Sequence, residues 1–329
     1  MKSRFLVGIG MLAVVTLAIG GTAVAQRFRQ IVQMEQQRRG AVPADPNMSL
    51  ITAPGDYRFS FARDGITREY LVHVPKSYRG GATPMLVALH GGGGDADFQA
   101  DDSKYQLISK SEAAGFIAVF PNGYSRLGGV LATWNAGSCC GAAQKNQVDD
   151  VGFLHEVIRR VERQAKIDPT RVFMTGMSNG ALMSWRMACE ASDLIHGIAP
   201  VEGTDNTAHC TPSRPVPVIE FHSLDDDHIP LNGGRGVSAL TDTDFTGVPA
   251  TQAKWVQLDR AAPAAKRVLT VAGAHCDLHP ARPGGAPVEL CLTDTGGHSW
   301  PGGGAQQGRK QPSMAISAND LMWSFFSSL

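Results

Sequence analysis

Short apolar runs alternate with amphipathic stretches along most of the chain. Alternating residues at 57–62 and 69–74 flank Asp64-Gly65 and predict a β-hairpin. Six further apolar runs have the length of buried strands: 85–89, 116–120, 171–175, 216–221, 268–271 and 288–293. Four stretches have helical character: 103–114, 151–166, 181–189 and 250–259. Asp150 is the predicted N-cap of the second of these, and Ser317 that of a final helix.

The order of these elements predicts the fold class. Strands alternate with helices, and the central strands are unbroken apolar runs rather than half-polar ones. Such strands are buried on both faces, as in a parallel sheet covered by helices. The chain shows no internal repeat. We therefore expect a single α/β domain over residues 48–329, with a mostly parallel central sheet and helices on both faces.

The first 47 residues have a different pattern. Lys2 and Arg4 precede an apolar run over residues 5–21, and Ala23-Val24-Ala25 follows it. These are the parts of a secretory signal peptide over residues 1–25, although an apolar run of this length is also near the lower limit for an uncleaved membrane anchor. Residues 26–47 are polar and rich in Gln, Arg, Pro and Ala, and predict a flexible lead-in.

Composition limits the cell compartment and the classes of partner that we expect for this protein. The chain has 30 basic and 30 acidic residues, which gives no electrostatic reason to bind nucleic acid or an anionic membrane. An even number of cysteines in an exported chain indicates disulfides, with buried free thiols as the alternative. Cys276 and Cys291 lie at facing ends of two predicted strands and form the expected local pair. The other four allow three pairings: Cys139, Cys140, Cys189 and Cys210.

A candidate nucleophile lies between a predicted strand and a predicted helix. Residues 176–180 read Gly-Met-Ser-Asn-Gly, a G-x-S-x-G element placed directly after the run 171–175. A serine at such a turn holds strained backbone angles, and the flanking glycines keep the turn free of clashes. The alternative is a plain glycine-rich turn. Its place between strand and helix favours Ser178 as a nucleophile whose hydroxyl lies above the sheet.

Partners for this serine follow in the required chain order. The strand at 216–221 is followed by three acids, Asp225 to Asp227, and the last strand is followed by His298 in a glycine-rich loop. An activated serine needs a histidine base and an acid that orients it. In this type of fold the order is serine, acid, histidine. The pattern therefore predicts a catalytic triad of Ser178, His298 and one of the three acids from Asp225 to Asp227.

An early glycine-rich loop completes the candidate site. His90-Gly91-Gly92-Gly93-Gly94 follows the strand at 85–89. Side-chain-free residues let the main chain approach a substrate and offer N–H groups to a developing oxyanion. Gly91 or Gly92 is the expected first donor and Asn179, directly after Ser178, the second. A structural glycine turn is the alternative interpretation.

Six motifs together resemble one enzyme family. They are the five-residue loop at 90–94, Phe120–Tyr124, Trp134–Gly141, Val148–Phe153, Gly176–Gly180 and Gly297–Gly302. In combination, over about residues 56–329, they resemble the polyhydroxybutyrate depolymerase and feruloyl esterase family, which is similar to carbohydrate esterase family 1 in the α/β-hydrolase superfamily. The family's acid loop, H-G-x-x-D-x-x-x-P, implies Asp226 rather than its neighbours as the triad acid. Ser223 replaces the glycine of that motif here.

The resemblance implies an α/β-hydrolase fold and an exported serine esterase without cofactor or metal. It implies feruloyl or acetyl esters of carbohydrates, or short hydroxyalkanoate oligomers, as substrates. Some members of the family have a polymer-binding domain after the catalytic one; we expect none here, and therefore soluble esters rather than crystalline polyester as substrates. Trp134 and Trp300 are then the expected aromatic walls of the substrate site, with core packing as the alternative.

Two other interpretations remain open at this stage. A serine peptidase would use the same triad, and a carbohydrate- or polymer-binding protein could use the same scaffold without catalysis. The expected state is a monomer in the periplasm or outside the cell, without nucleic-acid partners and without stable membrane association once the signal segment is removed.

Overall fold

The computed structural model describes residues 26, 29–30, 33–34, 44–45, 48–239, 241–306 and 310–329. The predicted signal segment, 1–25, lies outside the described residues. The chain divides into a unit up to residue 41 and a unit from residue 42 to 329. The described residues of the first unit are helical and exposed. In the second unit, Ala44 and Asp45, which the predicted flexible lead-in included, are instead joined to Ser60 by a β-bridge and a backbone hydrogen bond.

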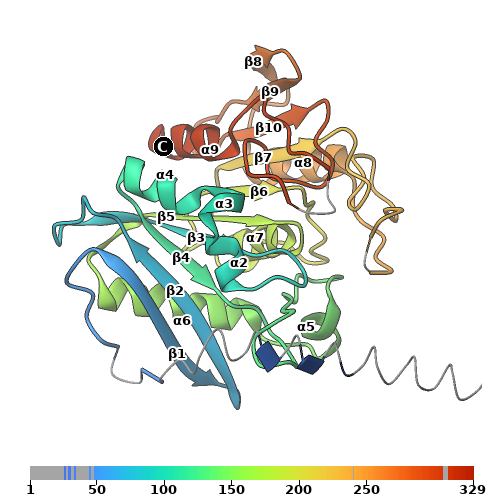
Figure 1. Ribbon diagram of the computed structural model, residues 1–329. Coiled ribbons are helices and arrows are strands. Elements are labelled where there is room, and N and C mark those ends of the chain that lie inside the picture. Colours follow the sequence, from blue (N-terminus) through green and yellow to red (C-terminus); the bar gives the residue numbers. More distant parts are fainter. Residues whose placement is uncertain are drawn as a thin grey trace, which may run out of the picture. The chain divides into compact units, whose positions relative to one another are not determined.

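One sheet of ten strands organises the described part of the second unit (Figure 1). Its order is β1-β2-β4-β3-β5-β6-β7-β10-β9-β8. The five pairs from β4 to β10 are parallel, and the pairs at both edges are antiparallel. The strands are β1 (Gly55–Arg63), β2 (Ile66–Val74), β3 (Thr83–Leu89), β4 (Ile117–Pro121), β5 (Ile167–Met177), β6 (Ile198–Val201), β7 (Val218–Ser223), β8 (Lys266–Val271), β9 (Ala274–His279) and β10 (Val288–Thr293).

Helices cover both faces of this sheet, as predicted. They are α2 (Ala96–Ala100), α3 (Asp102–Tyr105), α4 (Leu107–Ala114), α5 (Gly141–Lys145), α6 (Asp150–Gln164), α7 (Asn179–Glu190), α8 (Val248–Leu258) and α9 (Ala318–Ser327). In β3, Met85 and Val87 belong to a core cluster with side chains of α6, α7 and α8, whereas Leu86 belongs to a cluster with α2, α4 and α9. Because neighbouring residues of a strand face opposite sides, a continuous apolar run supplies both cores.

Most predicted elements are confirmed, with differences that have local causes. The helix predicted at 103–114 is two helices, because Gln106 has a left-handed backbone (φ 53°). Helix α6 is capped by Asp149, whose carboxylate accepts the N–H of Gly152 at 2.9 Å, and not by Asp150. The buried Asp150 instead accepts a hydrogen bond from Arg68 at 2.6 Å. The four-residue strand β6 was not predicted.

Three disulfides are present. Cys276 pairs with Cys291, as predicted, because the two lie opposite each other on β9 and β10. The pairing that sequence left open is Cys139 with Cys140 and Cys189 with Cys210. The second of these joins the end of α7 to the loop that follows β6.

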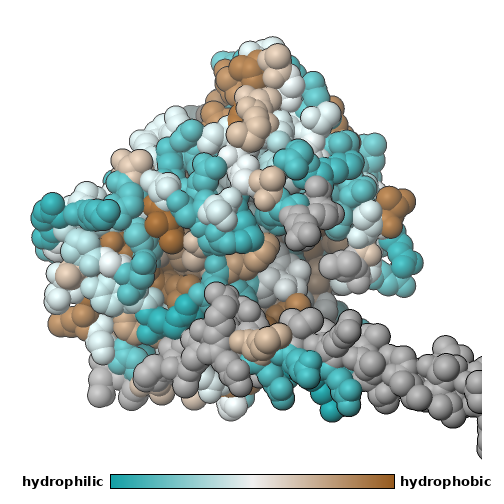
Figure 2. Space-filling model, in the orientation of Figure 1, coloured by the Kyte–Doolittle hydropathy of each residue, from teal (hydrophilic) through white to brown (hydrophobic). Residues whose placement is uncertain are grey.

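Figure 2 shows a hydrophobic area at the top of the molecule, over the β8–β9 hairpin of Figure 1. Val268 and Val271 of β8 are 49% and 40% exposed there. Within the described ranges, no helix combines the length and apolar character needed to cross a bilayer.

Candidate active site

Ser178 lies at the sharp turn between β5 and α7. It is the N-cap of α7 and has φ 57° and ψ −120°, a left-handed backbone that L-residues adopt at a cost in free energy. Its N–H donates to the carbonyl oxygen of Val201 at 2.9 Å, which holds the turn against the end of β6. The turn therefore fixes Ser178 above the carboxyl ends of the parallel strands, as the sequence predicted.

The glycines of this turn are required by close backbone packing. A methyl group on Gly180 would lie 2.7 Å from the carbonyl oxygen of His90, and one on Gly176 would clash with the carbonyl group of Gly180. Real Cβ atoms do not approach other atoms this closely, so only glycine fits both positions without a shift of the main chain.

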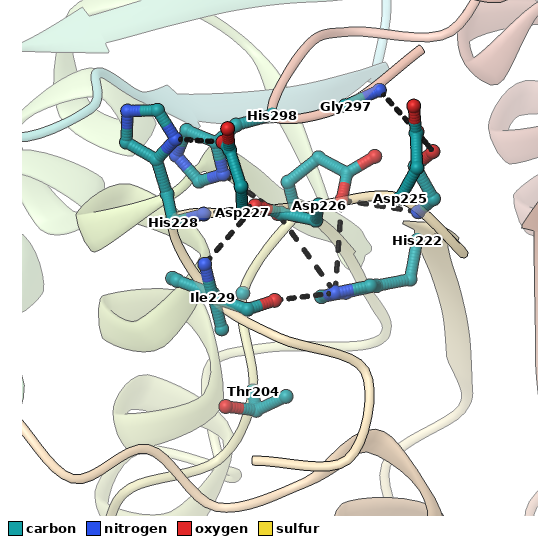
Figure 3. Close-up of polar contacts among 12 residues, drawn as sticks. Thr204, His222, Asp225, Asp226, Asp227, His228, Ile229, Gly297 and His298 are labelled. Atoms are coloured by element: carbon teal, nitrogen blue, oxygen red, sulfur yellow. Dashed lines mark hydrogen bonds and ion pairs between the residues drawn. The ribbon is translucent and has the colours of Figure 1, made fainter. Parts of the chain in front are cut away.

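Asp226 and His298 meet although they are 72 residues apart. Oδ2 of Asp226 accepts the hydrogen bond from Nδ1 of His298 at 2.7 Å, and both side chains are buried (Figure 3). With the proton on Nδ1, Nε2 of His298 is the nitrogen that can accept a proton. Oδ1 of Asp226 accepts the N–H groups of His228 (2.7 Å) and Ile229 (3.0 Å).

These contacts keep Asp226 ionised. Burial by itself would raise the pKa of this carboxyl group, but the charge and the hydrogen bond of His298 outweigh burial and hold the pKa well below its usual range. A carboxylate with three N–H donors is a stable hydrogen-bond acceptor for the histidine. Its position is the one that orienting acids take in serine hydrolases.

The neighbouring acids have other partners, which explains the choice among the three. Asp225 accepts the N–H of Gly297 at 2.7 Å and contacts Lys310, so it anchors the loop that carries His298. Asp227 accepts from Nδ1 of His228 at 2.8 Å. Neither carboxylate has a hydrogen bond to His298 in the described residues.

His228 was not singled out from the sequence, yet its ring covers that of His298. The two imidazoles are stacked with centroids 4.5 Å apart and 9° between their planes. Asp226, His228 and His298 bring ligand-type atoms within 4.8 Å of one another. The oxygens of Asp226 already accept three N–H groups, so this cluster is accounted for by hydrogen bonding and we assign no metal to it.

The glycine loop lies directly against the nucleophile. A methyl group on Gly91 would be 3.5 Å from Cβ of Ser178, and one on Gly92 would be 3.5 Å from Cβ of Asn179. The N–H groups of Gly93 and Gly94 donate to Ala132 and back to Gly91, at 2.8 and 3.0 Å. The later half of the loop thus uses its donors internally, and its first half is the part next to Ser178.

His90 stabilises the conformation of this loop. Its Nε2 accepts the N–H of Gly123 at 2.9 Å, so the neutral ring carries its proton on Nδ1, which donates to the carbonyl of Gly91 at 2.8 Å. Trp134 adds two contacts: its indole N–H donates to the carbonyl of His90, and its backbone N–H donates to Oδ1 of Asn179 at 2.7 Å.

Two cavities open beside Ser178. The larger is about 260 Å³, and its lining combines the polar side chains of Ser178 and His298 with an apolar part that includes Leu182, Ile229 and Phe245. Cys140, one half of the disulfide between adjacent cysteines, also lines it. The smaller is about 130 Å³ and lies between the glycine loop and Met177.

The predicted tryptophan walls are wrong. Trp134 is fully buried and Trp300 is 1% exposed, and neither lines either cavity. Trp300 packs edge-on against Tyr105 and donates its indole N–H to Asn319 of α9 at 3.1 Å. Both rings are core side chains with satisfied N–H groups. They cannot contact a substrate unless the core opens.

Comparisons with known proteins agree with the predicted resemblance. No protein-family model matches the chain. It is 28% identical over 239 residues to feruloyl esterase B of Piromyces equi, an alignment that covers 70% of this chain and 42% of that protein. It is 28% identical over 263 residues to the putative esterase NocK of Nocardia uniformis subsp. tsuyamanensis, covering 73% and 72%. The chain therefore matches less than half the length of the feruloyl esterase.

A solved structure shares the fold. Acetyl xylan esterase from Aspergillus awamori aligns with a TM-score of 0.55 and 15% sequence identity, over 80% of this chain and 94% of that one. With the sheet order and the helices on both faces, this shows the α/β-hydrolase fold that the motifs predicted. The resemblance to esterases of this fold is confirmed.

Proposed function

We propose that this chain, an α/β-hydrolase-fold relative of feruloyl and acetyl xylan esterases, is a carboxylic ester hydrolase that forms an acyl-enzyme on Ser178. The observation that carries the proposal is that Ser178, Asp226 and His298, from three segments far apart in the sequence, lie together in the structure. Ser178 and His298 line one cavity, and His298 is hydrogen-bonded to an ionised Asp226 at 2.7 Å. The names of the relatives favour the same chemistry.

The geometry supports a two-stage reaction. Oγ of Ser178 adds to the ester carbonyl carbon while Nε2 of His298 takes its proton, and Asp226 stabilises the resulting imidazolium. The N–H of Asn179, with that of Gly91 or Gly92, holds the oxyanion. Collapse of this intermediate breaks the ester C–O bond, and the leaving alkoxide takes the proton from His298. Water then repeats these steps on the acyl-enzyme and releases the acid.

The cavity favours an ester with one apolar group of moderate size. Its apolar lining can remove such a group from water, which stabilises binding by about 25 cal/mol for each Å² of apolar surface buried. Feruloyl or acetyl esters of carbohydrates are the proposed substrates, and short hydroxyalkanoate oligomers are the second class. The three disulfides support a protein exported to an oxidising compartment.

The test compares the wild type with Ser178→Ala on methyl ferulate, acetylated xylan and a soluble 3-hydroxybutyrate oligomer. We expect Ser178→Ala to lower kcat at least about a thousandfold on any ester that is turned over, with an unchanged circular dichroism spectrum. Equal turnover by the two proteins would refute the assignment of Ser178 as the nucleophile.

Two further readouts separate the competing functions. A fluorophosphonate probe should label the wild type and not Ser178→Ala, and absence of labelling would favour a binding protein on a hydrolase scaffold. Cleavage of a peptide panel with no ester turnover would favour a serine peptidase. Preference for the ferulate over the oligomer would place the substrate among plant cell-wall esters.

A further inference from the structure

A second carboxyl group lies buried beside Asp226. Glu202 directly follows β6 and is 0% exposed. Its Oε2 accepts the N–H of Ser223 at 3.1 Å, and the same oxygen is 3.7 Å from Nε2 of His222. Oδ2 of Asp226 is 3.8 Å from that nitrogen. Figure 3 shows His298 on one side of Asp226 and His222 on the other.

His222 does not supply a charge for these two acids. Its Nε2 donates to the carbonyl oxygen of Ile229 at 2.9 Å, which places the proton of the neutral ring on that nitrogen. Full burial lowers the pKa of His222, so the ring is neutral. Glu202 and Asp226 therefore lie together without a cation between them, and two adjacent buried negative charges would repel each other strongly.

One proton resolves this conflict, and the donors show which carboxyl group holds it. Asp226 accepts three N–H groups, whereas Glu202 accepts one and its Oε1 has no N–H or O–H donor in the described residues. Burial and the charge of Asp226 raise the pKa of Glu202 well above its usual range. Carboxylate oxygens of the two side chains lie within 4.8 Å of each other, so a neutral Glu202 is placed to donate a hydrogen bond to the Asp226 carboxylate.

The backbone holds Glu202 in place at a cost. Its φ is 49°, in the left-handed region that a side chain of this size rarely adopts. The N–H of Glu202 donates to the carbonyl of Phe221 in β7, and a methyl group on the next residue, Gly203, would lie 2.8 Å from the carbonyl oxygen of Ser178. Residues 202 and 203 are thus packed between the turn that carries Ser178 and the strand that leads to Asp226.

We propose that Glu202 is a positioning residue for the active site: its neutral carboxyl group donates a hydrogen bond to Asp226 and fixes the carboxylate that orients His298. The inference rests on the proposed function. Other titratable groups facing Glu202, Asp226 and His298 are Glu220 and His222 of β7, Asp225, Asp227 and His228 of the next loop, and Lys310. All of these are present in every variant below.

Two variants of nearly equal size separate the hydrogen bond from packing. In Glu202→Gln, the amide can accept from Ser223 and donate to Asp226. In Glu202→Met, the side chain fills the space without donating. We expect Glu202→Met to lower kcat by about tenfold with little change in KM, because a charged acceptor loses a donor. In the pH profile of kcat/KM, the acidic limb of Glu202→Met should move up by about half a pH unit. Without the hydrogen bond from residue 202, the negative charge of Asp226 attracts a proton to His298 more strongly. Glu202→Gln should keep the wild-type limb.

A readout independent of turnover is the low-field ¹H resonance of Nδ1–H of His298. It should shift in Glu202→Met and stay at the wild-type position in Glu202→Gln. A folded Glu202→Met with the wild-type limb and resonance would overturn the inference, and so would a Glu202→Gln changed as much as Glu202→Met. Wild-type turnover no higher than that of Ser178→Ala would refute the proposed function instead, and the resonance would still decide the role of Glu202.

Discussion

At the scale of single residues, the loop after β7 gives three adjacent acids three different tasks. Asp226 accepts from His298, Asp225 anchors the loop of Gly297, and Asp227 holds His228. The three side chains are chemically identical, and their partners differ because the backbone directs each one to a different place. We therefore expect the same Asp-to-Asn change to have unequal effects on activity at these positions.

Asp226→Asn should lower kcat by about 10³- to 10⁴-fold, because an amide N–H next to His298 favours the wrong imidazole tautomer. Asp227→Asn is the matched control and should cost less than about tenfold, since its carboxylate contacts His228 and Ser238 rather than the triad. Steady-state kinetics on the best ester substrate measures both. Equal losses in the two variants would contradict the assignment of Asp226.

At the scale of elements, the turn from β5 to α7 depends on close contact with β3. The helix begins beside the carbonyl groups at the end of β3, so the site lies where two backbone segments pass each other without side chains between them. Such contacts transmit any added volume directly to Ser178. The glycine loop after β3 and the nucleophile turn consequently behave as one packed element.

Gly180→Ala should therefore destabilise the fold by about 2–4 kcal/mol and reduce activity, because the new methyl group meets main-chain atoms that cannot rotate away. Gly81→Ala is the control, because a methyl group there meets nothing within 4 Å. Thermal unfolding and ester turnover are compared for both variants. A Gly180→Ala protein as stable and active as Gly81→Ala would show that the turn adjusts freely.

At the scale of the whole molecule, stability depends on a buried acid that does not belong to the proposed triad. Glu220 of β7 is fully buried and accepts a hydrogen bond from Nε2 of Gln252 in α8 at 2.6 Å. Burial raises its pKa from the usual 4.5 to about 8. In the folded state Glu220 is therefore protonated over a range of pH in which the unfolded chain has released that proton.

The sign of the resulting pH dependence follows. Between pH 4.5 and about 8 the folded state binds one more proton at Glu220 than the unfolded state does, so this group makes stability fall as pH rises. Glu220→Gln replaces the titrating carboxyl group with an amide that does not titrate. The urea midpoint of this variant minus that of the wild type should therefore be larger at pH 8 than at pH 5. Urea unfolding at both values measures this. A difference that does not change with pH would show that Glu220 is not protonated when folded.

The local signals in the chain determined much of this protein. Apolar run length and alternation predicted the hairpin and most strands, and Ser317 caps α9 as predicted, because a cap depends only on residues within one turn. Ser178, Asp226 and His298 could be chosen from the sequence, because each lies in a short motif after a predicted strand. Parallel strands bring such loops to one edge of the sheet.

Only the tertiary structure decided which side chains share an environment. Trp134 and Trp300 resemble substrate contacts in their motifs, but packing buries both. Asp150 looks like a helix cap, but a hydrogen bond to Arg68, from a distant strand, takes its carboxylate. Glu202 and Asp226 became neighbours because β6 and β7 pair, and burial in that contact, rather than any local motif, sets which carboxyl group holds the proton. Solvent exclusion and partner identity depend on long-range pairing, which residue patterns within a single segment do not encode.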